Sequence, residues 1–69
     1  MKSIEIGKLI QARRNALSLK QEDLSEMTGI TSKTIYLIES GKGNPSLDTL
    51  KKMLDVLGLD IVIEIKKVE

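Results

Sequence analysis

Apolar side chains recur at helical spacing in four separate segments of this 69-residue chain. Intervals of three and four residues place such side chains on one face of an α-helix. The pattern predicts helices over residues 4–17, 21–28, 32–40 and 47–57. The positions at this spacing are Ile6, Leu9, Ile10, Arg13 and Leu17, then Leu24 and Met27, then Ile35 and Ile38, and finally Leu47, Leu50, Met53, Leu54 and Leu57.

Residues typical of helix ends separate these segments. Gly29 supplies the permissive backbone that a sharp exit from the second helix needs, and Thr31 is a good N-cap for the third. Gly41 fits the position just after the third helix, Ser46 the N-cap of the fourth, and Gly58 its end. The sequence therefore predicts an all-α fold, a compact bundle of four helices joined by short turns.

The pattern changes to strict alternation after Gly58. Leu59, Ile61, Ile63 and Ile65 alternate with their neighbours as in a half-buried β-strand. A lone strand leaves its backbone N–H and C=O groups unpaired, and the sequence offers no second strand. We therefore expect residues 1–58 to form the helical domain and residues 59–69 a strand that pairs with its copy in a second subunit.

Composition excludes several classes of chemistry. The chain has no cysteine and no histidine, so a disulfide framework, the usual zinc ligands and the common nucleophile–base pairs are missing. We predict no catalytic residue, no metal site and no cofactor. No apolar run is long enough to span a membrane, the N-terminus does not resemble a signal peptide, and a cysteine-free chain suits the cytoplasm. The net charge of +1 makes the placement of cations, not their number, the relevant question.

The segment from Leu17 to Leu47 has the layout of a helix-turn-helix, in which one short helix enters the DNA major groove. The third helix has residues suited to base reading on the side away from Ile35 and Ile38. Lys33 can donate to guanine O6 and N7, Ser32 can bond to a base, and Leu37 can contact a thymine methyl group. These three residues are the predicted base readers.

Further residues are predicted to hold the DNA backbone. Gln21 lies at the start of the second helix, where unsatisfied N–H groups and the helix dipole attract phosphate. The other predicted phosphate contacts are Thr31, Tyr36, Lys42 and Asn44.

Plainer interpretations of the same residues remain open. Lys33 could be a solvated lysine, Tyr36 a core or boundary residue, and Leu37 a buried or dimer contact. The alternative function is a protein–protein interaction module that does not bind DNA and presents Tyr36 and Leu37 to a partner.

A combination of residues across the helical domain matches a known pattern: Gln21, Leu24, Gly29, Ile30, Thr31, Ile35, Ile38-Glu39, Gly41-Lys42, Pro45, Leu50 and Leu57-Gly58. With these residues the chain resembles the lambda-repressor/Cro-like helix-turn-helix family, also called XRE-like, over residues 4–58. The resemblance implies that the third helix reads the major groove, that the second straddles the DNA backbone, and that Arg14 pairs with Glu39. Two positions depart from the family pattern: Lys20 replaces a Ser or Thr cap, so the second helix should start less firmly, and Ser40 replaces a frequent Asn.

The tail LGLDIVIEIKK, following this domain, resembles that of HipB-type antitoxins. That resemblance implies an intersubunit sheet, repression of the protein's own operon, and a kinase-like toxin as a second partner. We therefore expect a sequence-specific repressor that binds a palindromic double-stranded operator as a homodimer, with recognition helices about 34 Å apart.

Overall fold

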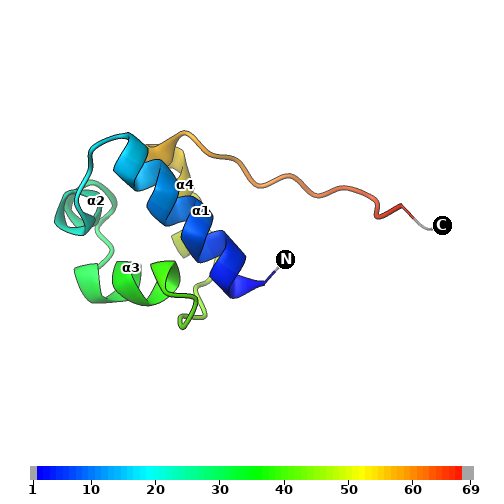
Figure 1. Ribbon diagram of the computed structural model, residues 1–69, viewed down its shortest axis with the longest axis horizontal. Helices are drawn as coiled ribbons and strands as arrows, with labels where there is room; N and C mark the ends of the chain where they lie inside the picture. The colour runs from blue at the N-terminus through cyan, green and yellow to red at the C-terminus, as the bar shows by residue number, and fades with distance from the viewer. Residues whose placement is uncertain (1, 68–69) are drawn as a thin grey trace.

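The four predicted helices are present in the computed structural model, which describes residues 2–67 (Figure 1). They are α1 (Ser3–Ala16), α2 (Gln21–Thr28), α3 (Ser32–Glu39) and α4 (Leu47–Leu57). Each end lies within one residue of its predicted position, which confirms the all-α prediction. None of the helices in the described part of the chain is long and apolar enough to cross a membrane.

The hydrophobic core lies between the four helices. Its buried members are Ile10, Leu24, Ile35, Ile38, Met53, Leu54 and Leu57. Six of these seven lie in α2, α3 and α4, where the helical spacing predicted buried side chains.

Four positions of the predicted apolar stripes are exposed instead. Met27 is 57% exposed because α2 turns Thr28, four residues after Leu24, toward the bundle, and Met27 then lies to one side. Leu47, the first residue of α4, is also exposed, since it lies beyond the core at the end of the helix. Leu9 and Leu17 likewise leave the inner face of α1, which Ile10 and Arg14 occupy.

The predicted capping residues bound α3 and α4. The Thr31 hydroxyl oxygen accepts from the Thr34 backbone N–H (3.2 Å), and that of Ser46 accepts from the Thr49 N–H (3.1 Å). After α3, Gly41 has a φ of 77° and its N–H donates to the Ile38 carbonyl, while the N–H of Lys42 donates to that of Leu37. This is the hydrogen-bonding pattern of a Schellman motif, and it confirms the predicted place of Gly41.

Gly7 lets α1 approach α3 closely. A Cβ atom at this position would meet the Ile38 carbonyl oxygen and would lie 2.6 Å from that of Glu39. Both oxygens are backbone atoms in the last turn of α3, so they cannot move aside as a flexible side chain could. The absence of a side chain at Gly7 therefore sets how closely α1 and α3 pack.

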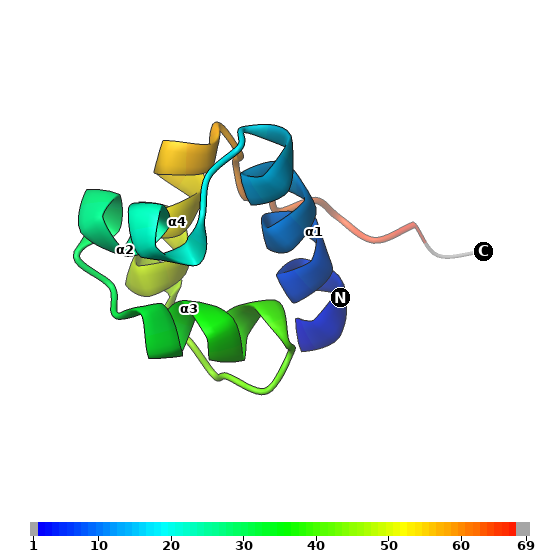
Figure 2. The same ribbon diagram turned by 60° about the vertical axis from the view of Figure 1, so that its left-hand side comes forward.

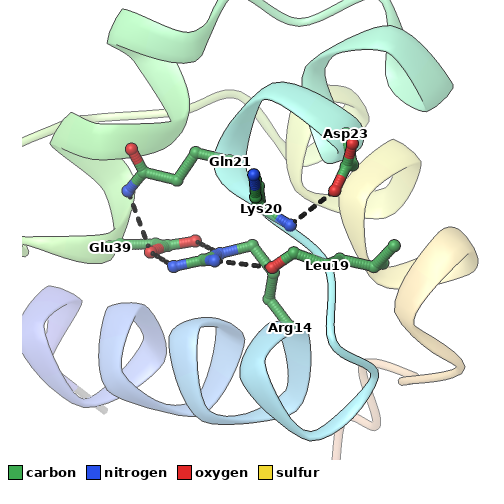
Figure 3. A network of polar contacts seen from close by, with 6 residues as sticks. All are labelled: Arg14, Leu19, Lys20, Gln21, Asp23 and Glu39. Carbon is green, nitrogen blue, oxygen red and sulfur yellow. Dashed lines mark hydrogen bonds and ion pairs between the residues drawn. The ribbon is translucent and has the colours of Figure 1, made fainter.

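An ion pair between Arg14 of α1 and Glu39 of α3 joins the two helices (Figure 3). Arg14 Nε donates to Glu39 Oε2 (2.7 Å), and Arg14 Nη2 donates to Glu39 Oε1 (2.9 Å). The remaining arm, Nη1, donates to the Leu19 carbonyl (2.8 Å) in the turn before α2. Gln21 Nε2 also donates to Glu39 Oε1 (3.1 Å), so the network connects three helices.

Because both side chains are buried, each charge depends on the other for compensation. The Arg14 and Glu39 side chains are only 9% and 2% exposed. The hydrogen bond to Glu39 raises the pKa of Arg14, against the opposing effect of burial. A raised arginine pKa contributes stability that is fully present below the ordinary pKa and is lost only as strongly alkaline pH passes the folded-state value. The cation is therefore retained throughout the ordinary pH range.

The C-terminal segment differs from its predicted form. Among residues 2–67 no strand forms, and the chain beyond Leu59 runs away from the bundle as an extended tail (Figure 1). Leu59 packs partly against the core, whereas Ile61, Ile63 and Ile65 are exposed. A strand needs a neighbour for its hydrogen bonds, and the predicted neighbour belongs to a second subunit. Met1 and residues 68–69, which the predicted domains also include, lie outside the described residues.

Replacing Gly7 with alanine should destabilise the protein by about 1–3 kcal/mol, because the added methyl group overpacks the contact with α3. Gly29→Ala is the matched control: its Cβ would meet no atom within 4 Å, so only the strain of a φ of 76° remains, about 1 kcal/mol. Urea unfolding followed by circular dichroism measures both. Helix propensity alone would make Gly7→Ala stabilising, and that result would contradict the close approach.

Removing one partner of the buried ion pair should cost about 3–5 kcal/mol, because the other charge stays buried without compensation. We expect this loss for Arg14→Met and a much smaller loss for the double variant Arg14→Met/Glu39→Leu. Lys52→Met, at an exposed position of α4, should change the free energy of unfolding by less than about 0.5 kcal/mol. Additive losses in the double variant would show that the two side chains do not act as a pair.

Candidate DNA interface

The turn between α2 and α3 is held by the side chain of Thr28. Its hydroxyl donates to the Leu24 carbonyl (2.7 Å) and accepts from the Ile30 backbone N–H (3.2 Å). Gly29 follows in a left-handed conformation, with φ of 76°. These contacts fix the angle between the two short helices, which form the predicted helix-turn-helix (Figure 2).

The inner face of α3 is fully used by the fold. Ile35 and Ile38 are buried in the core, and Glu39 is buried against Arg14. The opposite side of α3 is not covered by another helix, as Figures 1 and 2 both show. A helix held by one side presents the other side to a ligand.

The predicted base readers lie toward this open side with different exposures. Lys33 is exposed in the first turn of α3, while Ser32 and Leu37 are only half-buried and keep part of their surface accessible. Tyr36, predicted to contact sugar-phosphate, is 53% exposed and is therefore not a core residue. The structure thus brings Ser32, Lys33, Tyr36 and Leu37 together on one short helix.

Lys42 and Asn44 lie in the loop that follows α3, and both side chains are exposed. The backbone N–H groups of Lys42 and Gly43 both donate to the Leu37 carbonyl, at 3.0 and 3.1 Å. The loop is therefore bound to the last turn of α3. Lys33 and Lys42 place positive charge near both ends of that helix.

Three polar side chains near this surface already have partners within the protein. Gln21 uses its amide nitrogen for Glu39, and the Thr31 hydroxyl donates to Thr34 Oγ1 (2.9 Å) while capping α3. The Ser40 hydroxyl donates to the Leu37 carbonyl (2.9 Å). To contact phosphate, Gln21 and Thr31 would use donors that are not engaged in these bonds, or would break the bonds to Glu39 and Thr34.

Charge near the start of α2 is mixed. Glu22 and Asp23 lie in its first turn. Acidic residues there interact favourably with the helix dipole but repel phosphate. Asp23 Oδ2 accepts from the Lys20 backbone N–H (2.7 Å), which fixes the helix start without a Ser or Thr cap (Figure 3). The Lys20 side chain makes no capping hydrogen bond, as expected, and the bond to Asp23 supports the helix start in its place. The compensating signal was the acid three residues after Lys20.

Lys8 and Gln11 are polar neighbours that the sequence interpretation did not include. Both are exposed on α1 and border the same shallow depression as Gln21, Tyr36 and Ser40. Their spacing of three residues indicated a shared helix face, but only the packing of α1 on α3 places that face beside Tyr36. They add a lysine and an amide next to the open side of α3.

Comparison with known proteins agrees with this arrangement. The sequence profile of the helix-turn-helix family matches residues 10–63. An uncharacterized HTH-type transcriptional regulator of Methanothermobacter thermautotrophicus is 37% identical over 57 residues, which cover 83% of each chain. Another from Haemophilus influenzae is 38% identical over 58 residues, 84% of this chain and 58% of that protein.

The regulator PuuR of Escherichia coli is 36% identical over 55 residues, 80% of this chain but 30% of its own length. This chain therefore spans less than a third of PuuR, and its similarity to PuuR is limited to that part. The helix-turn-helix geometry, the match over residues 10–63 and these relatives lead to one conclusion: the chain belongs to the XRE-type helix-turn-helix family of DNA-binding transcriptional regulators.

Proposed function

We propose that this protein is a transcriptional repressor that binds a palindromic operator, in a sequence-specific manner, as a homodimer. The observation that carries the proposal is the division of α3 into two sides. Ile35, Ile38 and Glu39 hold it to the bundle, and the uncovered side presents Lys33 and Tyr36.

Base reading would come from the first turns of α3. The Lys33 ammonium group can donate to guanine O6 and N7 in the major groove, and Ser32 can add a hydrogen bond. The accessible part of Leu37 would contact a thymine methyl group. Its partial burial fixes its position, which suits a contact that depends on shape.

Phosphate contacts would align the helix in the groove without reading sequence. Lys42 and Asn44, on the loop bound to the end of α3, and Tyr36 beside it are suited to this role. Gln21 and Thr31 would add contacts from the start of each helix of the motif. Since lysine–phosphate contacts release counterions, affinity should fall steeply as salt rises.

Two copies would meet through the tail, with Leu59, Ile61, Ile63 and Ile65 forming the intersubunit apolar face. A two-fold axis would then relate two recognition helices, which matches the symmetry of a palindromic operator. Occupying such a site blocks access by other proteins, and this favours repression. A kinase-like toxin partner is part of the same proposal only through the similarity of the tail to HipB-type antitoxins.

Lys33→Ala should relax base preference. We expect affinity for the selected operator to fall by about five- to 150-fold, with little change on a random duplex, because a base contact carries about 1–3 kcal/mol of discrimination. Lys42→Ala is the matched comparison: as a phosphate contact it should weaken both duplexes alike and reduce the salt slope by about one. Fluorescence anisotropy titrations with DNA selected from a random pool measure these effects.

Equal losses for Lys33→Ala on both duplexes would reject its base-reading role. No DNA binding by the unmodified protein at low salt would reject the proposed function itself. That result would favour the alternative interaction module, in which Tyr36 and Leu37 contact another protein.

Deleting residues 61–69 should give a folded monomer with much weaker operator binding. Leu59 and the four helices remain, so the core is unchanged, while the proposed pairing surface is lost. Sedimentation velocity measures the mass, and circular dichroism checks the fold. A variant that remains dimeric would show that the tail is not the interface.

A further inference from the structure

The apolar side of the tail is covered at its base and open beyond it. Leu59 packs on the core and Ile61 is about half exposed, but Ile63 and Ile65 are 94% and 98% exposed. Alternation puts all four side chains on one side of an extended chain. The same apolar surface therefore continues from the core into solvent.

Apolar residues of the bundle, exposed at Leu9 and Leu47 and partly buried at Leu50, line two depressions at the tail base. Leu9 and Leu50 line a groove together with Leu59 and Ile61. Leu47 lines a second depression, together with Ile61 and Ile63. A second copy covering these side chains and the tail would bury one continuous apolar surface.

A two-fold symmetric pair of antiparallel strands permits few registers. The two-fold axis is perpendicular to the ribbon and places one residue, the centre, directly opposite its own copy. Residues equally far before and after the centre then lie opposite each other. The apolar sides of both strands then face the same way. Charges on the alternate positions, Asp60, Glu64 and Lys66, can distinguish the possible registers.

Centring the pair on Val62 sets Asp60 opposite Glu64, and centring it on Glu64 sets two copies of Glu64 opposite each other. Like charges directly opposite each other destabilise a ribbon. Centring it on Ile65 pairs Glu64 with Lys66 but sets Ile63 opposite Lys67, which puts a charge on the apolar side. Centring it on Ile61 sets Ile65 opposite Leu57, which belongs to α4. Each of these four registers contains a conflict.

Centring the pair on Ile63 has none of these conflicts. Ile63 meets its own copy and Ile61 meets Ile65 on the apolar side. On the other side, Asp60 lies opposite Lys66 at both ends of the ribbon, and Val62 lies opposite Glu64. This register joins all three isoleucines and forms two attractive charge pairs.

We infer that the tail docks on a second copy of this chain in this single register, with Ile63 on the two-fold axis and Asp60 paired with Lys66 of the other copy. The inference rests on the proposed homodimer and adds the residue pairing to it. The exposed apolar residues beside the tail base, Leu9 and Leu47, border the surface that the ribbon covers.

Single cysteines test the register directly, since the full chain contains none of its own. Under mild oxidation, Ile63→Cys should form a covalent dimer quickly, because opposed Cβ atoms lie about 4.5–5.5 Å apart. Val62→Cys and Glu64→Cys are the controls: in this register each lies roughly 8 Å from its own copy, beyond disulfide reach. Fastest cross-linking at position 62 or 64 would overturn the register.

Charge reversal gives a second readout. Asp60→Lys and Lys66→Asp should each weaken dimerisation by about tenfold or more, because each replaces two attractive pairs with two repulsive ones. Asp60→Lys/Lys66→Asp should restore it, as measured by sedimentation equilibrium. Loss without restoration would overturn the Asp60–Lys66 pairing.

Sedimentation of the unmodified chain distinguishes failure of the proposed homodimer from failure of the register alone. A monomer at all concentrations would reject the proposed homodimer together with the register. A dimer that cross-links at another position, or that charge reversal does not affect, would reject the register alone.

Discussion

The ion pair between Arg14 and Glu39 is the contact on which the position of α3, the proposed recognition helix, depends. Glu39 closes α3, where the helix dipole disfavours a carboxylate, and its burial removes water that would otherwise solvate it. Arg14 offsets both effects with two hydrogen bonds, and with its third arm it binds the Leu19 carbonyl before α2. One guanidinium group thus fixes α3 relative to α1 and to the start of α2.

The same contact explains why the outer side of α3 is available. Gly7 brings α1 against the last turn of α3, and the inner side chains Ile35 and Ile38 fill the core. Every strong contact of α3 is therefore made on one side or at its end. Lys33 and Tyr36 are exposed and contribute little to this packing, so substituting them should leave the fold intact.

Features set by neighbouring residues could be predicted from the sequence, whereas features set by the packing of one helix on another could not. Helices, caps such as Ser46 and the turn at Gly29 arise from neighbouring residues, and they were predicted within one residue. Gly7 gave no signal, because a glycine inside a helix shows its purpose only when α3 lies against it. Arg13 looked like a member of an apolar stripe, yet its Nε caps the Leu57 carbonyl of α4 (2.7 Å). Ser18 adopts a φ of 57° after α1, a place where glycine would be the expected signal.

Arg13 and Leu59 also connect the tail to the proposed DNA-reading surface. Arg13 binds the end of α4, the Leu59 backbone N–H donates to the Leu54 carbonyl (2.9 Å), and α4 shares its core with α3. The base of the tail and the recognition helix therefore belong to one packed unit. In a dimer joined by the tails, moving the centre of the ribbon by one residue would displace the two copies by about 6.7 Å. That distance is about two base pairs along B-DNA. In the proposed dimer, with the ribbon along the DNA axis, the residue on the two-fold axis would set the spacing of the operator half-sites as well as the stability of the dimer.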